Sequence, residues 1–137
     1  MRADVYWRAL PLEDSGWNQV RCLYAYLSPH DREVLYLGKS WGAAVRGRWN
    51  SADKDAFWDD LERERGIMNH AVMLGEIVLA SPLRLTSQLL SDVESLLINK
   101  IQPWGNIQAC SSRISRPGLE VWCAGAWPLR SRVFRDD

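Results

Sequence analysis

The stretch VRCLYAYLSPHDREVLYLGKS, residues 20–40, decides the fold that the sequence predicts. Its outer parts, Val20–Leu27 and Glu33–Leu37, are rich in the β-branched and aromatic residues that favour strands. The segment SPHDR between them has the composition of a turn. We therefore expect two neighbouring antiparallel strands that form a β-hairpin.

Further strands and helices are indicated on both sides of this hairpin. We predict strands at Val5–Leu12, Ala71–Leu79 and Leu119–Cys123, and helices at Trp41–Trp49, from Ser51 or Asp53 to Arg65, and at Thr86–Ile101. Gly66 and Pro103 are expected to stop the last two helices. The sequence therefore predicts an α/β protein of the α+β kind. Its sheet would be small, mixed or antiparallel and three-stranded, flanked by helices and followed by a C-terminal extension.

Length and charge restrict the possible functions. The 137 residues suffice for one domain with its own core, and we expect the C-terminal extension at residues 107–137. Basic and acidic residues balance at 17 each, so any binding of nucleic acid must be local. Acidic residues crowd residues 53–64 and arginines crowd residues 113–135. We expect the acidic helix to be a solvated face turned away from nucleic acid.

The cysteines and the hydropathy indicate a compartment. Cys22, Cys110 and Cys123 are odd in number and have no C-x-x-C spacing. This pattern disfavours a zinc site or a disulfide framework and indicates a reducing cytoplasm. No apolar run approaches the roughly 18 residues of a membrane span. We therefore expect neither membrane insertion nor secretion.

One carboxylate is expected in a partly apolar position. Leu90, Val93, Leu97 and Ile101 lie three or four residues apart and form an apolar stripe on the predicted helix. Glu94 falls on or beside this stripe, so its carboxylate should be partly removed from water. Such groups are normally paired or bound to a metal. The alternative is a glutamate at the edge of the stripe that reaches solvent or pairs with a nearby arginine.

The hairpin carries Tyr24 and Tyr36 on facing strands, followed by GKS at residues 38–40. Taken singly, two such tyrosines indicate a cross-strand aromatic pair, and the glycine indicates a turn. In their order, however, CLY at residues 22–24 and YLG at residues 36–38 resemble the paired tripeptides of the GIY-YIG nucleases.

The resemblance continues as far as Asn106, and we name residues 20–106 the motif core. The family carries an arginine on the next helix, which Arg46 matches in spacing and which Arg48, followed by Trp49, matches in character. The family then carries a helix glutamate, an apolar pair, a lysine and a Pro-x-x-Asn. The corresponding residues here are Glu94, Leu97-Ile98, Lys100 and Pro103–Asn106.

The resemblance implies an endonuclease that hydrolyses phosphodiester bonds, with DNA favoured as the substrate. Glu94 would hold one divalent ion, Mg²⁺ or Mn²⁺. Tyr24 would be the general base towards water, and Tyr36 would position the water or the phosphate. Arg48 or Arg46 would grip the phosphate, because a guanidinium binds it bidentately. Further substrate contacts are expected from Lys39, Ser40, Asn106, Arg113 and Arg116, with Asn106 also bracing the site.

Two departures from the family pattern leave an alternative function open. Cys22 stands where the family has glycine, and Ala52 or Asp53 stands where many members carry a histidine. Lys39 or His70 could replace that histidine, although a lone histidine in an apolar context is more often structural. The alternative is a nucleic-acid-binding module that kept the fold and lost turnover.

The tail and the tryptophans leave two further points open. Arg113, Arg116, Arg130 and Arg132 are interleaved with Trp122 and Trp127. These side chains could contact phosphates and stack on bases, or they could form a solvated basic face over a secondary core. The chain has eight Trp residues, so a protein-interaction domain that uses exposed Trp is a third possibility.

Overall fold

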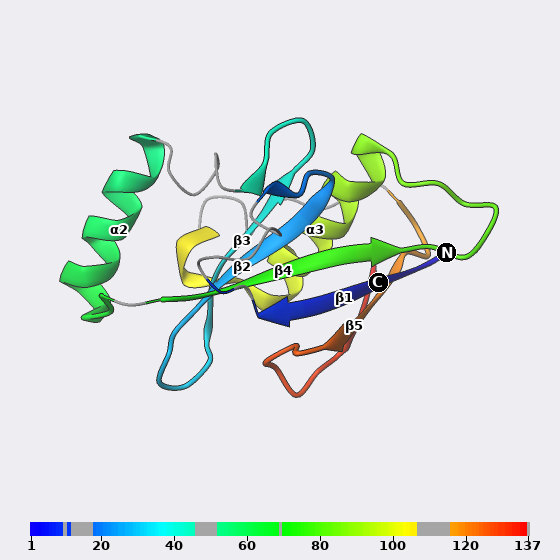
Figure 1. Ribbon diagram of the computed structural model, residues 1–137. Helices are drawn as coiled ribbons and strands as arrows, with labels where there is room; N and C mark the ends of the chain where they lie inside the picture. Colours follow the sequence, from blue (N-terminus) through cyan, green and yellow to red (C-terminus); the bar gives the residue numbers. More distant parts are fainter. Residues whose placement is uncertain (10, 12–17, 46–51, 69, 107–115, 137) are drawn as a thin grey trace.

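The computed structural model describes residues 1–9, 11, 18–45, 52–68, 70–106 and 116–136. Its strands are β1 (Arg2–Ala9), β2 (Cys22–Leu27), β3 (Val34–Ser40), β4 (Ala71–Val78), β5 (Glu120–Gly125) and β6 (Val133–Arg135). Its helices are α2 (Ala52–Arg65), α3 (Ser87–Ile101) and the short 3-10 helix η2 (Trp104–Asn106). Figure 1 shows α3 behind the sheet and α2 beside the start of β4.

All six strands form one sheet in the order β3-β2-β4-β1-β5-β6. The pairing of β1 with β5 is parallel, and the other pairings are antiparallel. The α+β class, the mixed sheet and the hairpin of β2 and β3 are thus confirmed, but the three-stranded sheet is wrong. The C-terminal segment, predicted as an extension, supplies two strands, and β1 connects them to the hairpin half of the sheet.

Alternation of side chains along the strands divides the core into two layers. On one face Ala3, Val5 and Trp7 of β1 are fully or almost fully buried, together with Leu23 and Ala25 of β2. The buried side of α3 packs on this face, which we name the α3 face. On the opposite face Tyr24 and Tyr26 of β2 join Leu61 of α2 in a second cluster, and we name this the α2 face. Because both faces of β2 are covered, all of its residues are buried.

Local signals set the start of α3 and the end of α2, the latter at the predicted Gly66. The hydroxyl of Thr86 accepts a hydrogen bond from the backbone N–H of Leu89 at 3.0 Å and caps α3. Gly66, with φ +64°, follows α2 and ends it in the left-handed conformation. The backbone N–H of Gly66 donates to the carbonyl of Glu62 at 2.9 Å, which satisfies one of the last carbonyls of the helix.

The predicted helix Trp41–Trp49 is wrong at its start. Residues 41–43 would be its first residues, and the chain there forms a bend instead. The backbone N–H of Val45 donates to the carbonyl of Gln19 at 3.2 Å, so the chain is still paired with the segment that precedes β2. Residues 46–51 lie outside the described ranges.

No helix within the described ranges is both long enough and apolar enough to cross a membrane.

Candidate functional site

The hairpin brings Tyr24 and Gly38 together on the α2 face. They are partners in the register of β2 and β3, and the ring of Tyr24 lies over Gly38. A Cβ atom at residue 38 would lie only 2.4 Å from Cζ of Tyr24 and 2.5 Å from its hydroxyl oxygen. Gly38 therefore allows the phenol of Tyr24 to reach across β3, which is the edge strand of the sheet.

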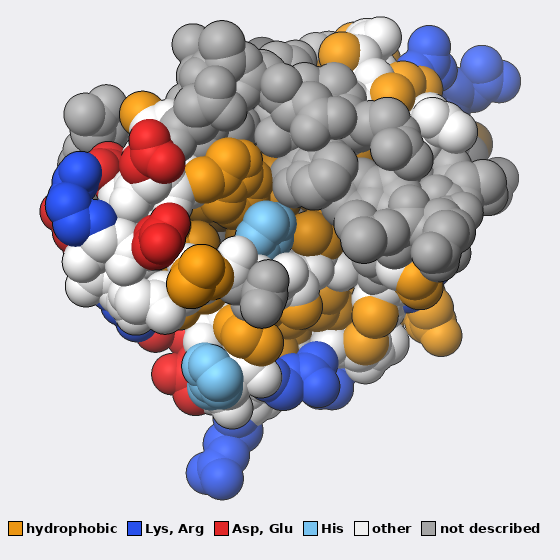
Figure 2. All heavy atoms as spheres, turned by 60° about the vertical axis from the view of Figure 1, so that its left-hand side comes forward, with side chains coloured by type: hydrophobic (Ala, Val, Ile, Leu, Met, Phe, Trp, Pro, Cys, Tyr) orange, Lys and Arg blue, Asp and Glu red, His pale blue; other side chains and the backbone are white. Residues whose placement is uncertain are grey.

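Tyr24 belongs to an aromatic cluster on the α2 face. Its ring centroid lies 6.1 Å from that of Tyr36 and 5.6 Å from that of Tyr26. The cluster continues through Phe57, Trp58, His70 and Trp104. In Figure 2, acidic side chains gather on one side of the surface and hydrophobic side chains lie exposed beside them. The two motif tyrosines are thus held by aromatic packing, with Tyr24 only 2% exposed.

Lys39 and Glu94 meet on the α3 face. Nζ of Lys39 lies 3.6 Å from Oε1 of Glu94, whose side chain is 16% exposed. Buried Leu90, Val93 and Leu97 surround this part of α3. The expected partial desolvation of the Glu94 carboxylate is therefore observed. Among the described residues, a cation beside it is Lys39 of the motif strand.

The tyrosines and Glu94 approach β3 from opposite faces. Neighbouring residues of a strand point to opposite sides, and partners across a pair of strands share a side. Tyr24 shares its side with Gly38, whereas Lys39 shares its side with Leu23 in the α3-face cluster. The thickness of β3 therefore separates the phenol of Tyr24 from the carboxylate of Glu94.

Asn106 holds the outer edge of the same strand. Its Oδ1 accepts a hydrogen bond from the backbone N–H of Leu37 at 2.8 Å, and its Nδ2 donates to the carbonyl of Leu37 at 2.9 Å. The side chain thus acts as the next strand would, and it satisfies both backbone groups of Leu37. This contact joins η2 to β3 and engages both ends of the amide.

Ser40 and Cys22 are buried partners on the α2 face, next to Gly38 and Tyr24. Within the described part of the chain, the hydroxyl of Ser40 has no hydrogen-bond partner. Burial raises the pKa of the Cys22 thiol to about 12, so the thiol stays protonated at neutral pH. Cys22 therefore fills space in this layer and is a poor nucleophile.

His70 packs among aromatic side chains. Its ring stacks on Trp58 with centroids 4.1 Å apart, and it meets Tyr26 edge-on at 5.2 Å. Burial lowers the pKa of His70 below its ordinary value, so the ring is neutral at pH 7. These contacts support the structural interpretation of this histidine.

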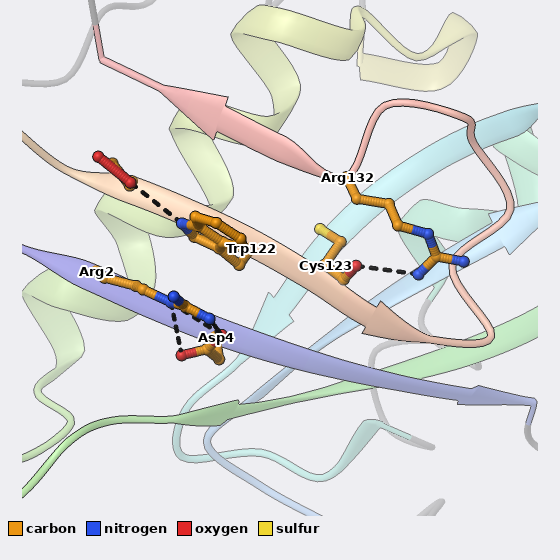
Figure 3. A network of polar contacts seen from close by, with 6 residues as sticks. Arg2, Asp4, Trp122, Cys123 and Arg132 are labelled. Atoms are coloured by element: carbon orange, nitrogen blue, oxygen red, sulfur yellow. Dashed lines mark hydrogen bonds and ion pairs between the residues drawn. The ribbon is translucent and has the colours of Figure 1, made fainter.

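The tail residues of the described ranges mainly support the C-terminal strands. Nε of Arg116 pairs with Oδ2 of Asp92 on α3 at 2.6 Å. Arg132 donates to the carbonyl of Cys123 at 3.1 Å (Figure 3). Trp127 is buried and donates to the carbonyl of Ser131 at 2.8 Å. Arg116 and Arg132 are therefore already engaged, while Arg46, Arg48 and Arg113 lie outside the described residues.

Sequence reasoning missed a pair of side chains at the open end of the hairpin. The guanidinium carbon of Arg21 lies 4.9 Å from the centroid of the Trp41 ring. The sequence pattern assigns Trp41 to the start of a helix, which gives no indication of its position opposite Arg21. Extending the register of β2 and β3 by one pair, beyond Cys22 and Ser40, would have indicated it.

Comparisons with protein-family models, with curated proteins and with solved structures found no match for this chain.

One described carboxylate near β3, that of Glu94, could contribute to holding a magnesium-like ion. Within the described ranges, no group of three or more His, Cys, Asp or Glu side chains could hold a metal. Glu94 offers a mostly desolvated carboxylate beside the motif strand. Mg²⁺ keeps several of its waters and is often bound through one or two carboxylates and substrate phosphates. A single glutamate is therefore compatible with this ion.

Proposed function

We propose that this protein is a metal-dependent endonuclease of the GIY-YIG type, which hydrolyses phosphodiester bonds of nucleic acid, with DNA favoured. The observation that carries the proposal is the contact of Lys39 with the desolvated carboxylate of Glu94, one residue along β3 from Gly38 and the overlying Tyr24. The carboxylate of Glu94 and the ammonium of Lys39 thus lie on one face of the edge strand β3, and the phenol of Tyr24 lies on the other.

The outer edge of β3 is where we propose that the scissile phosphate lies. From the α2 face Tyr24 would accept a proton from the attacking water, and Tyr36 would orient that water. From the α3 face Lys39 would contact a phosphate oxygen, and Glu94 would hold Mg²⁺ or Mn²⁺. The bound ion would supply charge stabilisation to the leaving oxygen. Arg46 or Arg48 would complete the grip on the phosphate.

The remaining residues that were predicted to contact the substrate differ in how directly they could reach it. Asn106 would hold β3 in position through Leu37 rather than touch the substrate. Ser40 is fully buried, so its hydroxyl would reach a substrate only indirectly. Arg113 remains a proposed phosphate contact, whereas Arg116 would first have to leave Asp92.

The alternative of a binding module without turnover is favoured by Cys22, which adds a buried side chain where the family has glycine. The protein-interaction alternative is less favoured, because every described Trp is buried or half-buried. Among the described cysteines, Cys22 and Cys123 are buried free thiols, which supports a reducing cytoplasm as the proposed location.

The test is cleavage of a panel of DNA and RNA oligonucleotides, single- and double-stranded, by the parental protein and by Glu94→Gln. We expect cleavage with Mg²⁺ or Mn²⁺ and none in EDTA. Glu94→Gln should lose cleavage but keep or strengthen binding in EDTA, because a negative charge is removed near phosphate. Glu76→Gln, which neutralises an exposed carboxylate on β4, is the control and should cleave as the parent does. Parental turnover by Glu94→Gln would overturn the proposal.

A further inference from the structure

Arg21 and Trp41 form an exposed pair at the open end of the hairpin. Arg21 is exposed, and its guanidinium lies over the ring of half-buried Trp41. Trp41 also packs against the α3-face cluster, which restrains the position of its ring. We name these two residues the Arg21–Trp41 pair.

The pair lies beside the proposed site. Cys22 is opposite Ser40 in the register, so Arg21 and Trp41 are the next positions of the hairpin. Trp41 follows Lys39 by two residues, and both belong to the α3 side of the strand. A strip of side chains therefore runs from Glu94 through Lys39 to Trp41 and Arg21.

Nothing in the described fold requires the guanidinium at this position. No described carboxylate forms an ion pair with Arg21, and its φ of +58° is a conformation that residues with a Cβ rarely adopt. The sheet offers a comparison, because Arg2 also lies over a tryptophan, with its guanidinium carbon 3.8 Å from the centroid of the Trp122 ring. Arg2, however, is neutralised by Asp4 at 2.8 Å, as Figure 3 shows.

A planar cation over an indole has the chemistry that recognises a nucleobase. Indole rings and guanidinium planes both stack on bases, and an unneutralised guanidinium also attracts the adjoining phosphate. A base can reach such a surface only when it is unpaired, because the faces of paired bases are covered by their neighbours in the helix.

We infer that the Arg21–Trp41 pair stacks an unpaired nucleobase next to the cleaved phosphate, so that the substrate is single-stranded or locally opened at the cleavage position. This inference rests on the proposed function, which locates the phosphate near Lys39. Arg21 and Trp41 are then positioning residues, and paired duplex DNA is a poor substrate.

The first measurement is binding of a labelled single-stranded oligonucleotide in EDTA, so that cleavage plays no part. We expect Arg21→Ala and Trp41→Ala to weaken binding about tenfold, a typical loss for one stacked base. Trp41→Phe should weaken binding less than Trp41→Ala does, because phenylalanine keeps an aromatic face and most of the packing. Arg2→Ala removes the same charge from the neutralised pair and should bind within about twofold of the parent.

The second measurement repeats the binding with oligonucleotides that lack one base at successive positions. If the pair stacks one base, the loss caused by Trp41→Ala should disappear for the oligonucleotide that lacks that base, and only for that one. Two results would overturn the inference. One is that Arg21→Ala and Arg2→Ala weaken oligonucleotide binding equally. The other is that Trp41→Ala weakens binding by the same factor whichever base is missing.

The two proposals can fail separately. Cleavage by the parent, with binding unchanged in both Arg21→Ala and a folded Trp41→Ala, would remove the stacking role and leave the endonuclease in place. Position-dependent loss of binding without cleavage of any oligonucleotide would instead favour the binding module. Thermal melting of each variant checks that it is folded. If Trp41→Ala is unfolded, binding by Trp41→Phe and Arg21→Ala tests the stacking role instead.

Discussion

The ring of Tyr24 occupies the space beside Gly38, and a methyl group at residue 38 would clash with it. The new Cβ would lie 2.4 Å from Cζ of a ring that is itself buried. We expect Gly38→Ala to displace Tyr24, to lower the free energy of unfolding by about 1–3 kcal/mol and to reduce cleavage strongly. Urea unfolding and cleavage rates on the same preparations measure both effects.

Gly42→Ala is the matched control, because a Cβ at Gly42 would meet nothing within 4 Å. It should leave unfolding within about 0.5 kcal/mol of the parent and leave cleavage unchanged. If Gly38→Ala behaved like Gly42→Ala, the position of the Tyr24 phenol would be unimportant.

The two tyrosines of β2 test whether the hydroxyl itself matters. Tyr24→Phe should lose cleavage while the free energy of unfolding changes by about 1 kcal/mol or less, because only one hydroxyl is removed. Tyr26 is opposite Tyr36 rather than a glycine, so its phenol lacks the room that Gly38 gives to Tyr24, and burial also raises the pKa of Tyr26 above its ordinary value. Tyr26→Phe should therefore cleave normally. Parental cleavage rates in Tyr24→Phe would reduce Tyr24 to a packing residue.

At the scale of the elements, η2 and β3 are joined by the side chain of Asn106. Asn106→Ala removes two hydrogen bonds and leaves both backbone groups of Leu37 without their partner. We expect the free energy of unfolding to fall by about 2 kcal/mol and the amide hydrogen of Leu37 to exchange faster. Gln88→Ala, which removes one partly exposed hydrogen bond to Asp92, is the milder control. Unchanged exchange at Leu37 would contradict this role of Asn106.

Features set by neighbouring residues could be predicted from the sequence, whereas contacts between distant segments could not. Thr86 and Gly66 are local signals, so the ends of α2 and α3 could be predicted from a few neighbouring residues. The partner of Asn106 could not be predicted, because Leu37 is 69 residues away in the chain. In the same way, spacing along α3 indicated a desolvated Glu94, but only the assembled hairpin determined that Lys39 would be its partner.

For the whole molecule, the central feature is that β1 lies between β4 and β5. Figure 1 shows both ends of the chain on the same side of the sheet. The sequence motif covers residues 20–106, yet that range lacks β1 and the buried side chains of β5 and Trp127. Strands near both ends of the chain were predicted from local patterns, at Val5–Leu12 and Leu119–Cys123. Their place in one sheet with the hairpin could not be predicted, because pairing between the two ends of a chain leaves no local pattern.

This arrangement predicts that residues 20–106 do not fold alone. Without β1 the outer edge of β4 is open, and the α3-face cluster loses Val5 and Trp7 together with the C-terminal residues. We expect the fragment to unfold without a cooperative transition in circular dichroism, whereas residues 1–137 unfold cooperatively. A sharp, reversible transition in the fragment would contradict the prediction.

The parallel pairing of β1 with β5 has a consequence for the order of events during synthesis. The terminal ammonium of Met1 donates to the carbonyl of Gly118 at 2.9 Å, across a separation of 117 residues. Contacts between such distant segments form slowly, because a long loop must close first. As the chain leaves the ribosome, β1 can pair with β4 once residue 78 has emerged, but its other edge waits for residues 120–125. Until then the nascent chain carries an unpaired strand edge, which other chains can join and which a chaperone can protect.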